Sequence, residues 1–143
     1  MGTTVVAAVL SDQMIRVVHV GDSRAYKISS NGLIQMTRDH SVVQELVETG
    51  KLTPNEAKAH PRKNIITRAL GVDETVDIDF CEDRMEPEDV VLLCTDGLTN
   101  YLETDEIFRI ARSGGYYESA QQMVDLANQH GGGDNITVVA ITY

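Results

Sequence analysis

Hydrophobic and polar positions change their spacing along the chain, and each change predicts a different element. Residues 3–10, 14–20 and 24–28 are rich in β-branched apolar side chains separated by polar turns, which predicts three strands. Asn31-Gly32 predicts a tight hairpin that leads into a fourth strand over 33–36. The first quarter of the chain is therefore expected to form an antiparallel meander.

The spacing becomes helical after this meander. Ser41-x-x-Gln44 resembles a capping box, and apolar residues at helical spacing follow it until Gly50. Thr53-Pro54 predicts the start of a second helix, which must be short because Pro61 follows. We expect residues 42–64 to form a small polar helical insertion, more typical of a surface flap than of a core.

Strands and helices are both expected in the second half. Strands are predicted over 65–69, 75–81 and 90–95, helices over 104–112 and 118–130, and a closing strand over 136–143. Val76, Ile78 and Phe80 alternate with polar residues and share one face of their strand. The order of elements predicts an α+β fold built on an antiparallel sheet or a pair of sheets.

The most informative stretch is VVLLCTDGL at 90–98. An unbroken apolar run of this length predicts a strand that is buried on both faces. Asp96 follows where the run leaves the core, and an unpaired carboxylate is costly there. Gly97 permits a sharp turn or the close approach of a ligand. Taken alone, the stretch is explained more simply by an ordinary Asp-Gly turn.

Two further Gly-Asp sequences make a functional site more plausible than one isolated Asp-Gly turn does. Asp22 lies in VGDSRAY and Asp134 in GGGDN, each beside glycine at the end or start of an apolar run. If these strand ends share one edge of a sheet, the three aspartates offer an oxygen-rich site suited to Mg²⁺ or Mn²⁺. Such ions activate water and hold phosphoryl groups. The alternative is three structural turns with no ligand.

Charge and cysteine content limit the classes of function. The formal net charge of −10 argues against binding to nucleic acid or to an anionic membrane. No apolar run approaches the length of a membrane span, and no signal peptide is recognisable. Cys81 and Cys94 lie in apolar strand patterns without a CxxC motif, which predicts buried free thiols and a cytoplasmic protein.

Other chemistry finds little support in the residues. Asp77-x-Asp79 begins like a calcium-binding EF-hand loop, but Glu82 stands where that loop requires glycine. The four histidines lack metal-site spacing and are expected to be structural or exposed. Ser23 has no partnered histidine in the sequence, so it is a weak candidate for a nucleophile.

Six motifs in a fixed order define a resemblance. They are MGTT (1–4), VGDSRAY (20–26), TRDHS (37–41), ITRALG (66–71), CTDGL (94–98) and GGGDNITV (131–138). Together they resemble the metal-dependent protein phosphatases of the PPM, or type 2C, family, in the style of its bacterial members. The resemblance covers essentially the whole chain, residues 1–143.

This resemblance implies an antiparallel β-sandwich flanked by helices and the hydrolysis of phosphoserine and phosphothreonine by a metal-activated water. It implies Mn²⁺ or Mg²⁺, two or three ions in an intact protein, with Asp22, Asp96 and Asp134 as ligands. The flap of the family maps to residues 42–64. The implied partners are phosphoproteins, the substrates of a Ser/Thr kinase.

The departure from the family lies before the first motif. The family's N-terminal part supplies an aspartate that bridges the metals, a phosphate-binding arginine and a histidine, so no catalytic residue is assigned to this chain. The chain thus resembles a C-terminal portion that is inactive alone and self-associates through surfaces left uncovered. The alternative is a complete product that begins at Met1, a non-catalytic binding or regulatory module that keeps the fold.

Overall fold

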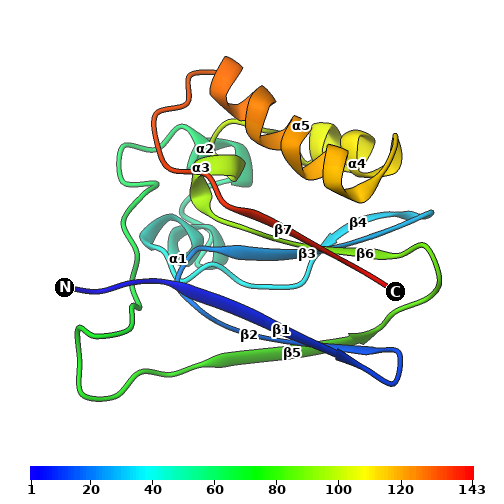
Figure 1. Ribbon diagram of the computed structural model, residues 1–143. Helices are drawn as coiled ribbons and strands as arrows, with labels where there is room; N and C mark the ends of the chain where they lie inside the picture. The colour runs from blue at the N-terminus through cyan, green and yellow to red at the C-terminus, as the bar shows by residue number, and fades with distance from the viewer.

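A computed structural model describes residues Met1–Tyr143, which form two antiparallel sheets and a layer of helices (Figure 1). One sheet has the order β1-β2-β5 and the other the order β4-β3-β6-β7. The strands are β1 (Val5–Ser11), β2 (Met14–Val20), β3 (Arg24–Ser29), β4 (Gly32–Gln35), β5 (Asp79–Arg84), β6 (Val90–Cys94) and β7 (Val138–Thr142). The α+β sandwich expected from the sequence is confirmed.

The strand β6 lies between two apolar clusters. Val91 belongs to the cluster between the two sheets, together with Ile15 and Met85. Leu92, the next residue, belongs to the larger cluster between the second sheet and the helices. Because successive side chains of a strand point to opposite faces, this division explains the unbroken apolar run of β6.

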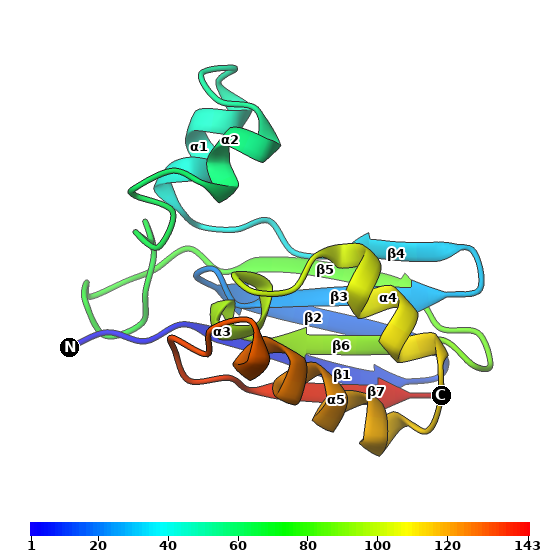
Figure 2. The same ribbon diagram turned by 90° about the horizontal axis from the view of Figure 1, so that it is seen from above.

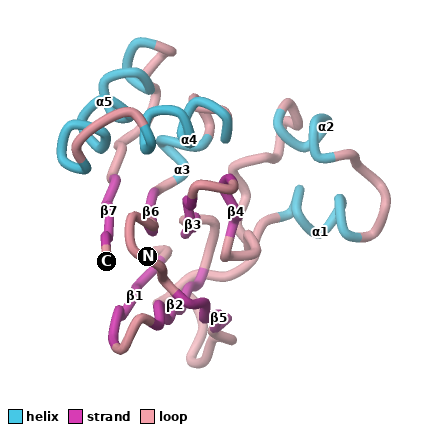
Figure 3. The backbone as a smooth tube through the Cα atoms, turned by 90° about the vertical axis from the view of Figure 1, so that its right-hand side faces the viewer, coloured by secondary structure: helices cyan, strands magenta, loops and turns pink.

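Helices cover only one outer face of the sandwich. The helices α4 (Thr104–Arg112) and α5 (Tyr116–Gln129) pack on the β4-β3-β6-β7 sheet, as Figures 1 and 2 show. Ile107 and Met123 supply their buried contacts. The outer face of the β1-β2-β5 sheet has no such layer (Figure 3). None of the helices is long and apolar enough to cross a membrane.

The segment between β4 and β5 leaves the sandwich as a separate helical excursion. It contains α1 (Val42–Glu48) and α2 (Pro54–Lys58), neither of which has a buried residue. Thr53 and Glu56 form the predicted capping box, whereas at Ser41 only the cap bond to the Gln44 amide is present. Figure 2 shows the two helices projecting to one side of the sheets.

Two predicted strands are wrong in position. Residues 65–69 form no strand, and within them only Ile66 makes an isolated bridge, to Ser41. The strand expected over 75–81 begins at Asp79, where pairing with His19 becomes available. Its apolar positions face outward: Ile78 is 61% exposed and Phe80 is 59% exposed.

The start of the third helical segment was not expected. The short helix α3 (Asp96–Thr99) follows β6 directly, where the sequence suggested a simple turn. Leu98 is fully buried and anchors this helical turn to the core. The last long helix begins at Tyr116, two residues before the predicted position, after the Gly114-Gly115 pair.

Candidate metal centre

The three predicted aspartates lie at one end of the second sheet. Asp22 precedes β3, Asp96 follows β6, and Asp134 precedes β7. In the antiparallel register Arg24 is paired with Cys94, and Cys94 with Val138. The start of β3, the end of β6 and the start of β7 therefore meet, which is the shared edge that the sequence argument required.

A close backbone contact holds the Asp96 turn against the Asp134 loop. A Cβ atom at Gly97 would lie only 2.0 Å from the backbone oxygen of Asn135. Beside this contact, the Thr95 amide donates to the Thr137 carbonyl oxygen at 3.2 Å, and the Thr137 amide donates to Thr95 Oγ1 at 3.1 Å. Glycine at 97 is thus required by the approach of these two segments.

Asp22 and Asp96 line a cavity of about 390 Å³ between the sheet end and the helical excursion. Its sheet-side wall includes Arg24 and Asp39, and the opposite wall comes from both α1 and α2. Asp134 is exposed and lies outside the lining of this cavity. The cavity is therefore bounded by the aspartates on one side and by the excursion on the other.

Burial and mutual repulsion raise the pKa of two of these aspartates. Burial and the nearby charges of Asp96 and Asp39 raise the pKa of Asp22 to about 6. Burial and the charge of Asp134 raise the pKa of Asp96. Both shifts mean that the ionised carboxylates are destabilised here, and a bound cation would relieve this. A donor set of carboxylate oxygens fits a hard divalent ion.

Sequence reasoning missed an arginine and an aspartate beside this site. Arg24 Nη2 and Nε donate to Asp39 at 2.6 and 2.9 Å, and Arg24 Nη1 donates to the Tyr26 hydroxyl at 2.8 Å. Asp39 is only 7% exposed. Arg24 is thus ion-paired with Asp39, and although its charge lowers the pKa of Asp22 and of Asp96, burial and the neighbouring carboxylates outweigh it. Asp39 lies in the motif TRDHS, which could have pointed to it. It was not selected because, unlike Asp22, Asp96 and Asp134, it has no glycine beside it.

A second cluster, formed by His19, His40 and Asp79, has ligand atoms within 4.8 Å of one another. The two imidazole rings are stacked, with centroids 4.7 Å apart and 14° between their planes. Nitrogen lone pairs lie in the ring plane, so one ion could not meet both rings without their rotation. Arg68 Nη1 also donates to Asp79 Oδ1 at 3.0 Å. His40 and Asp79 are therefore hydrogen-bonded to each other, whereas His19 Nε2 contacts the Arg38 carbonyl oxygen at 2.8 Å.

Comparison with known proteins agrees with the geometry. Residues 1–136 match the family described as Protein phosphatase 2C. The serine/threonine phosphatase stp of Listeria welshimeri is 44% identical over 144 residues, covering 99% of this chain and 56% of that protein. The crystal structure of Stp1 from Staphylococcus aureus superposes with a TM-score of 0.94 at 39% identity, covering 100% of this chain and 57% of that chain.

A structure of the catalytic domain of the phosphatase PstP in complex with two manganese ions also matches. Its TM-score is 0.88 at 36% identity, and the match covers 98% of this chain and 58% of that chain. The chain belongs to the protein phosphatase 2C family. It spans less than two thirds of the length of each of these three relatives.

Proposed function

We propose that this chain is the C-terminal portion of a metal-dependent phosphatase, here called the parent protein, that hydrolyses phosphoserine and phosphothreonine in proteins. The observation that carries the proposal is the pair Asp22 and Asp96 in one cavity, each with a raised pKa caused by burial and neighbouring carboxylates. Family membership supports the reaction class, since named relatives are serine/threonine phosphatases.

We propose Asp22, Asp96 and Asp134 as ligands for Mn²⁺ or Mg²⁺. Their shared sheet end and mutual repulsion support this assignment, as does the manganese in the PstP structure. When bound, such an ion lowers the pKa of water and offsets the charge of a phosphoryl group. The residues of this chain would hold that ion, and they line the adjoining cavity from both the sheet end and the excursion.

Substrate access is assigned to the segment 42–64, which we propose to be the flap of the family. Its α1 and α2 residues complete the cavity opposite the aspartates.

No catalytic residue is assigned within this chain: the general acid and the phosphate-binding arginine belong to the N-terminal portion of the parent. The substrates we propose are targets of a Ser/Thr kinase. A cytoplasmic location is supported by the free thiols Cys81 and Cys94.

Metal removal tests the proposal directly. In the parent protein, a chelator should lower turnover of a phosphothreonine peptide and of p-nitrophenyl phosphate by more than about 100-fold, because the ion supplies much of the charge stabilisation. Added Mn²⁺ should restore it, and this chain alone should remain inactive. Activity that survives chelation would contradict the metal mechanism. No turnover by the parent under any condition would favour the non-catalytic alternative.

We also propose that the chain self-associates when separated from the rest of the parent. The outer face of the β1-β2-β5 sheet exposes a row of apolar side chains in which Val18 pairs with Phe80, and Val9 lies on the same face. Val9 is 64% exposed and Phe80 59%. Covering ~400 Å² of such surface is worth roughly 10 kcal/mol before the entropy of association, at about 25 cal/mol per Å².

Light scattering coupled to gel filtration tests this association. The chain should elute as a dimer or larger species whose mass rises with concentration. Combining Val9→Thr with Phe80→Thr should shift it toward the monomer, because both changes make the sheet face polar. Ile34→Thr is the matched control, since Ile34 is 65% exposed but lies on the other sheet. A wild-type monomer at all concentrations would show that the exposed face is tolerated in water.

A further inference from the structure

His40 holds the peptide unit of Gly21 from both sides. The Gly21 amide donates to His40 Nδ1 at 2.9 Å, and the His40 amide donates to the Gly21 carbonyl oxygen at 3.0 Å. His40 is 1% exposed, so water does not compete for either bond. Gly21 has φ +110°, and it immediately precedes Asp22. The position of Asp22 is therefore tied to this imidazole.

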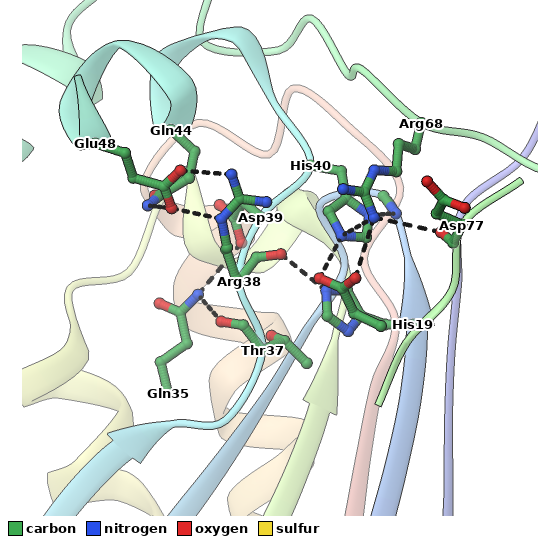
Figure 4. A network of polar contacts seen from close by, with 12 residues as sticks. His19, Gln35, Thr37, Arg38, Asp39, His40, Gln44, Glu48, Arg68 and Asp77 are labelled. Carbon is green, nitrogen blue, oxygen red and sulfur yellow. Dashed lines mark hydrogen bonds and ion pairs between the residues drawn. The ribbon is translucent and has the colours of Figure 1, made fainter. Parts of the chain in front are cut away.

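The other ring nitrogen of His40 is fixed by a hydrogen bond to a carboxylate. Because Nδ1 accepts a hydrogen bond, Nε2 carries the proton, and it donates to Asp79 Oδ2 at 2.8 Å. The second oxygen of Asp79 accepts from Arg68 Nη1 at 3.0 Å. Burial lowers the pKa of His40, so the ring stays neutral at neutral pH. His19 stacks on the same ring and limits its rotation (Figure 4).

His40 also lies at the base of the flap, next to both of its stems. The outgoing stem begins at Ser41, which forms a bridge with Ile66 of the returning stem. The Thr67 amide donates to the His40 carbonyl oxygen at 2.9 Å. Arg68, one residue further along the returning stem, contacts the carboxylate that orients the ring. A displacement of the stems would thus reach His40 through its backbone and through Arg68.

We propose that His40 is a positioning residue that sets the place of Asp22 at the metal centre and couples it, through Asp79 and Arg68, to the stems of the flap. The inference rests on the proposed function of Asp22 as a metal ligand. A ligand contributes affinity only when its oxygen is held at the correct place, and residues that orient ligands are commonly worth 10–100-fold in metal affinity or activity. The coupling connects flap position with metal affinity.

Two substitutions of His40 in the parent protein separate the roles of its nitrogens. His40→Asn places an amide near Nδ1 and can still accept from Gly21, whereas His40→Gln places its amide near Nε2 and can reach only Asp79. Both create a similar small loss of packing. We expect the Gln variant to weaken Mn²⁺ binding at least about 10-fold in equilibrium dialysis, and the Asn variant to weaken it less. Hydrogen exchange at the Gly21 amide should accelerate only in the Gln variant.

Asp79→Ala removes the carboxylate that joins His40 to Arg68 at a partly exposed position, and urea unfolding checks that the variant is folded. It should weaken Mn²⁺ binding by several-fold, because the ring of His40 loses its orienting acceptor. Asp77→Ala is the matched control: this acid lies two residues earlier, its side chain is exposed, and only its backbone oxygen contacts Arg68. The control should bind Mn²⁺ like the wild type.

The outcomes distinguish the two proposals. Equal Mn²⁺ affinity and equal Gly21 exchange in the Asn and Gln variants would overturn the positioning role. Faster Gly21 exchange with unchanged Mn²⁺ affinity would overturn it as well, because the bonds between His40 and Gly21 would then serve the fold only. The proposed function would stand in that case. A wild-type parent that binds Mn²⁺ but lacks phosphatase activity would refute the proposed function. The positioning role of His40 would then be tested by Mn²⁺ binding and Gly21 exchange alone.

Discussion

Asp96→Asn in the parent protein should lower metal-dependent turnover by more than about 100-fold, a larger loss than that expected for an orienting residue. Asparagine keeps the shape of the side chain but removes the charge at the position between Asp22 and Asp134. The charges of Asp22 and Asp96 interact, as do those of Asp96 and Asp134. The measurement is the rate with a phosphothreonine peptide over a range of Mn²⁺ concentrations.

The stability of the same variant shows whether folding is responsible. Burial and the charge of Asp134 destabilise ionised Asp96, so the metal-free Asp96→Asn variant should unfold at the same urea concentration as the wild type or a higher one. Asp73→Asn serves as the control, because Asp73 is exposed in a loop before β5. Full activity in Asp96→Asn would show that Asp96 is not a ligand of the metal.

Gly97→Ala should destabilise the parent protein by about 3 kcal/mol or more, at the upper end of the cost of overpacking. The added Cβ would lie 2.0 Å from the Asn135 backbone oxygen, so two backbone segments would have to separate. That separation moves Asp96 away from Asp134, and Mn²⁺ affinity should fall together with stability. Urea unfolding followed by circular dichroism measures the first effect, and equilibrium dialysis the second.

A second glycine provides the matched control for this change. A Cβ at Gly114, between α4 and α5, would meet no atom within 4 Å. Gly114→Ala should therefore alter the free energy of unfolding by no more than about 0.5 kcal/mol. If Gly97→Ala were equally mild, the contact between the Asp96 turn and the Asp134 loop would not be important for either fold or site.

Strands whose environment is fully reflected in the local pattern of residues were predictable from the sequence. The run 90–94 is apolar throughout because β6 contacts both clusters, and Asn31-Gly32 gave the β3–β4 hairpin. The alternation around Phe80 was recognisable as a strand pattern, but alternation alone does not state which face is covered. Pairing with β2 sets where β5 begins, and that information lies sixty residues earlier in the chain.

The candidate site was predictable only in part, for a similar reason. Asp22, Asp96 and Asp134 each stand beside glycine at a strand end, so local sequence marks them. Arg24 and Asp39 meet only because the end of the sheet brings positions fifteen residues apart together. The role of His40 depends on a backbone amide and on two side chains from other segments, none of which has a local signature.

The construction of the excursion 42–64 has an evolutionary consequence. Its helices bury no residue, and its two ends are joined by the bridge between Ser41 and Ile66. The closure entropy of such a loop rises only slowly with its length. The length and sequence of the excursion can therefore diverge between paralogues at almost no cost to the sandwich, while the bridged stems keep each new version beside the same aspartates. If the excursion is the flap, as proposed above, its surface can change without disturbing the scaffold.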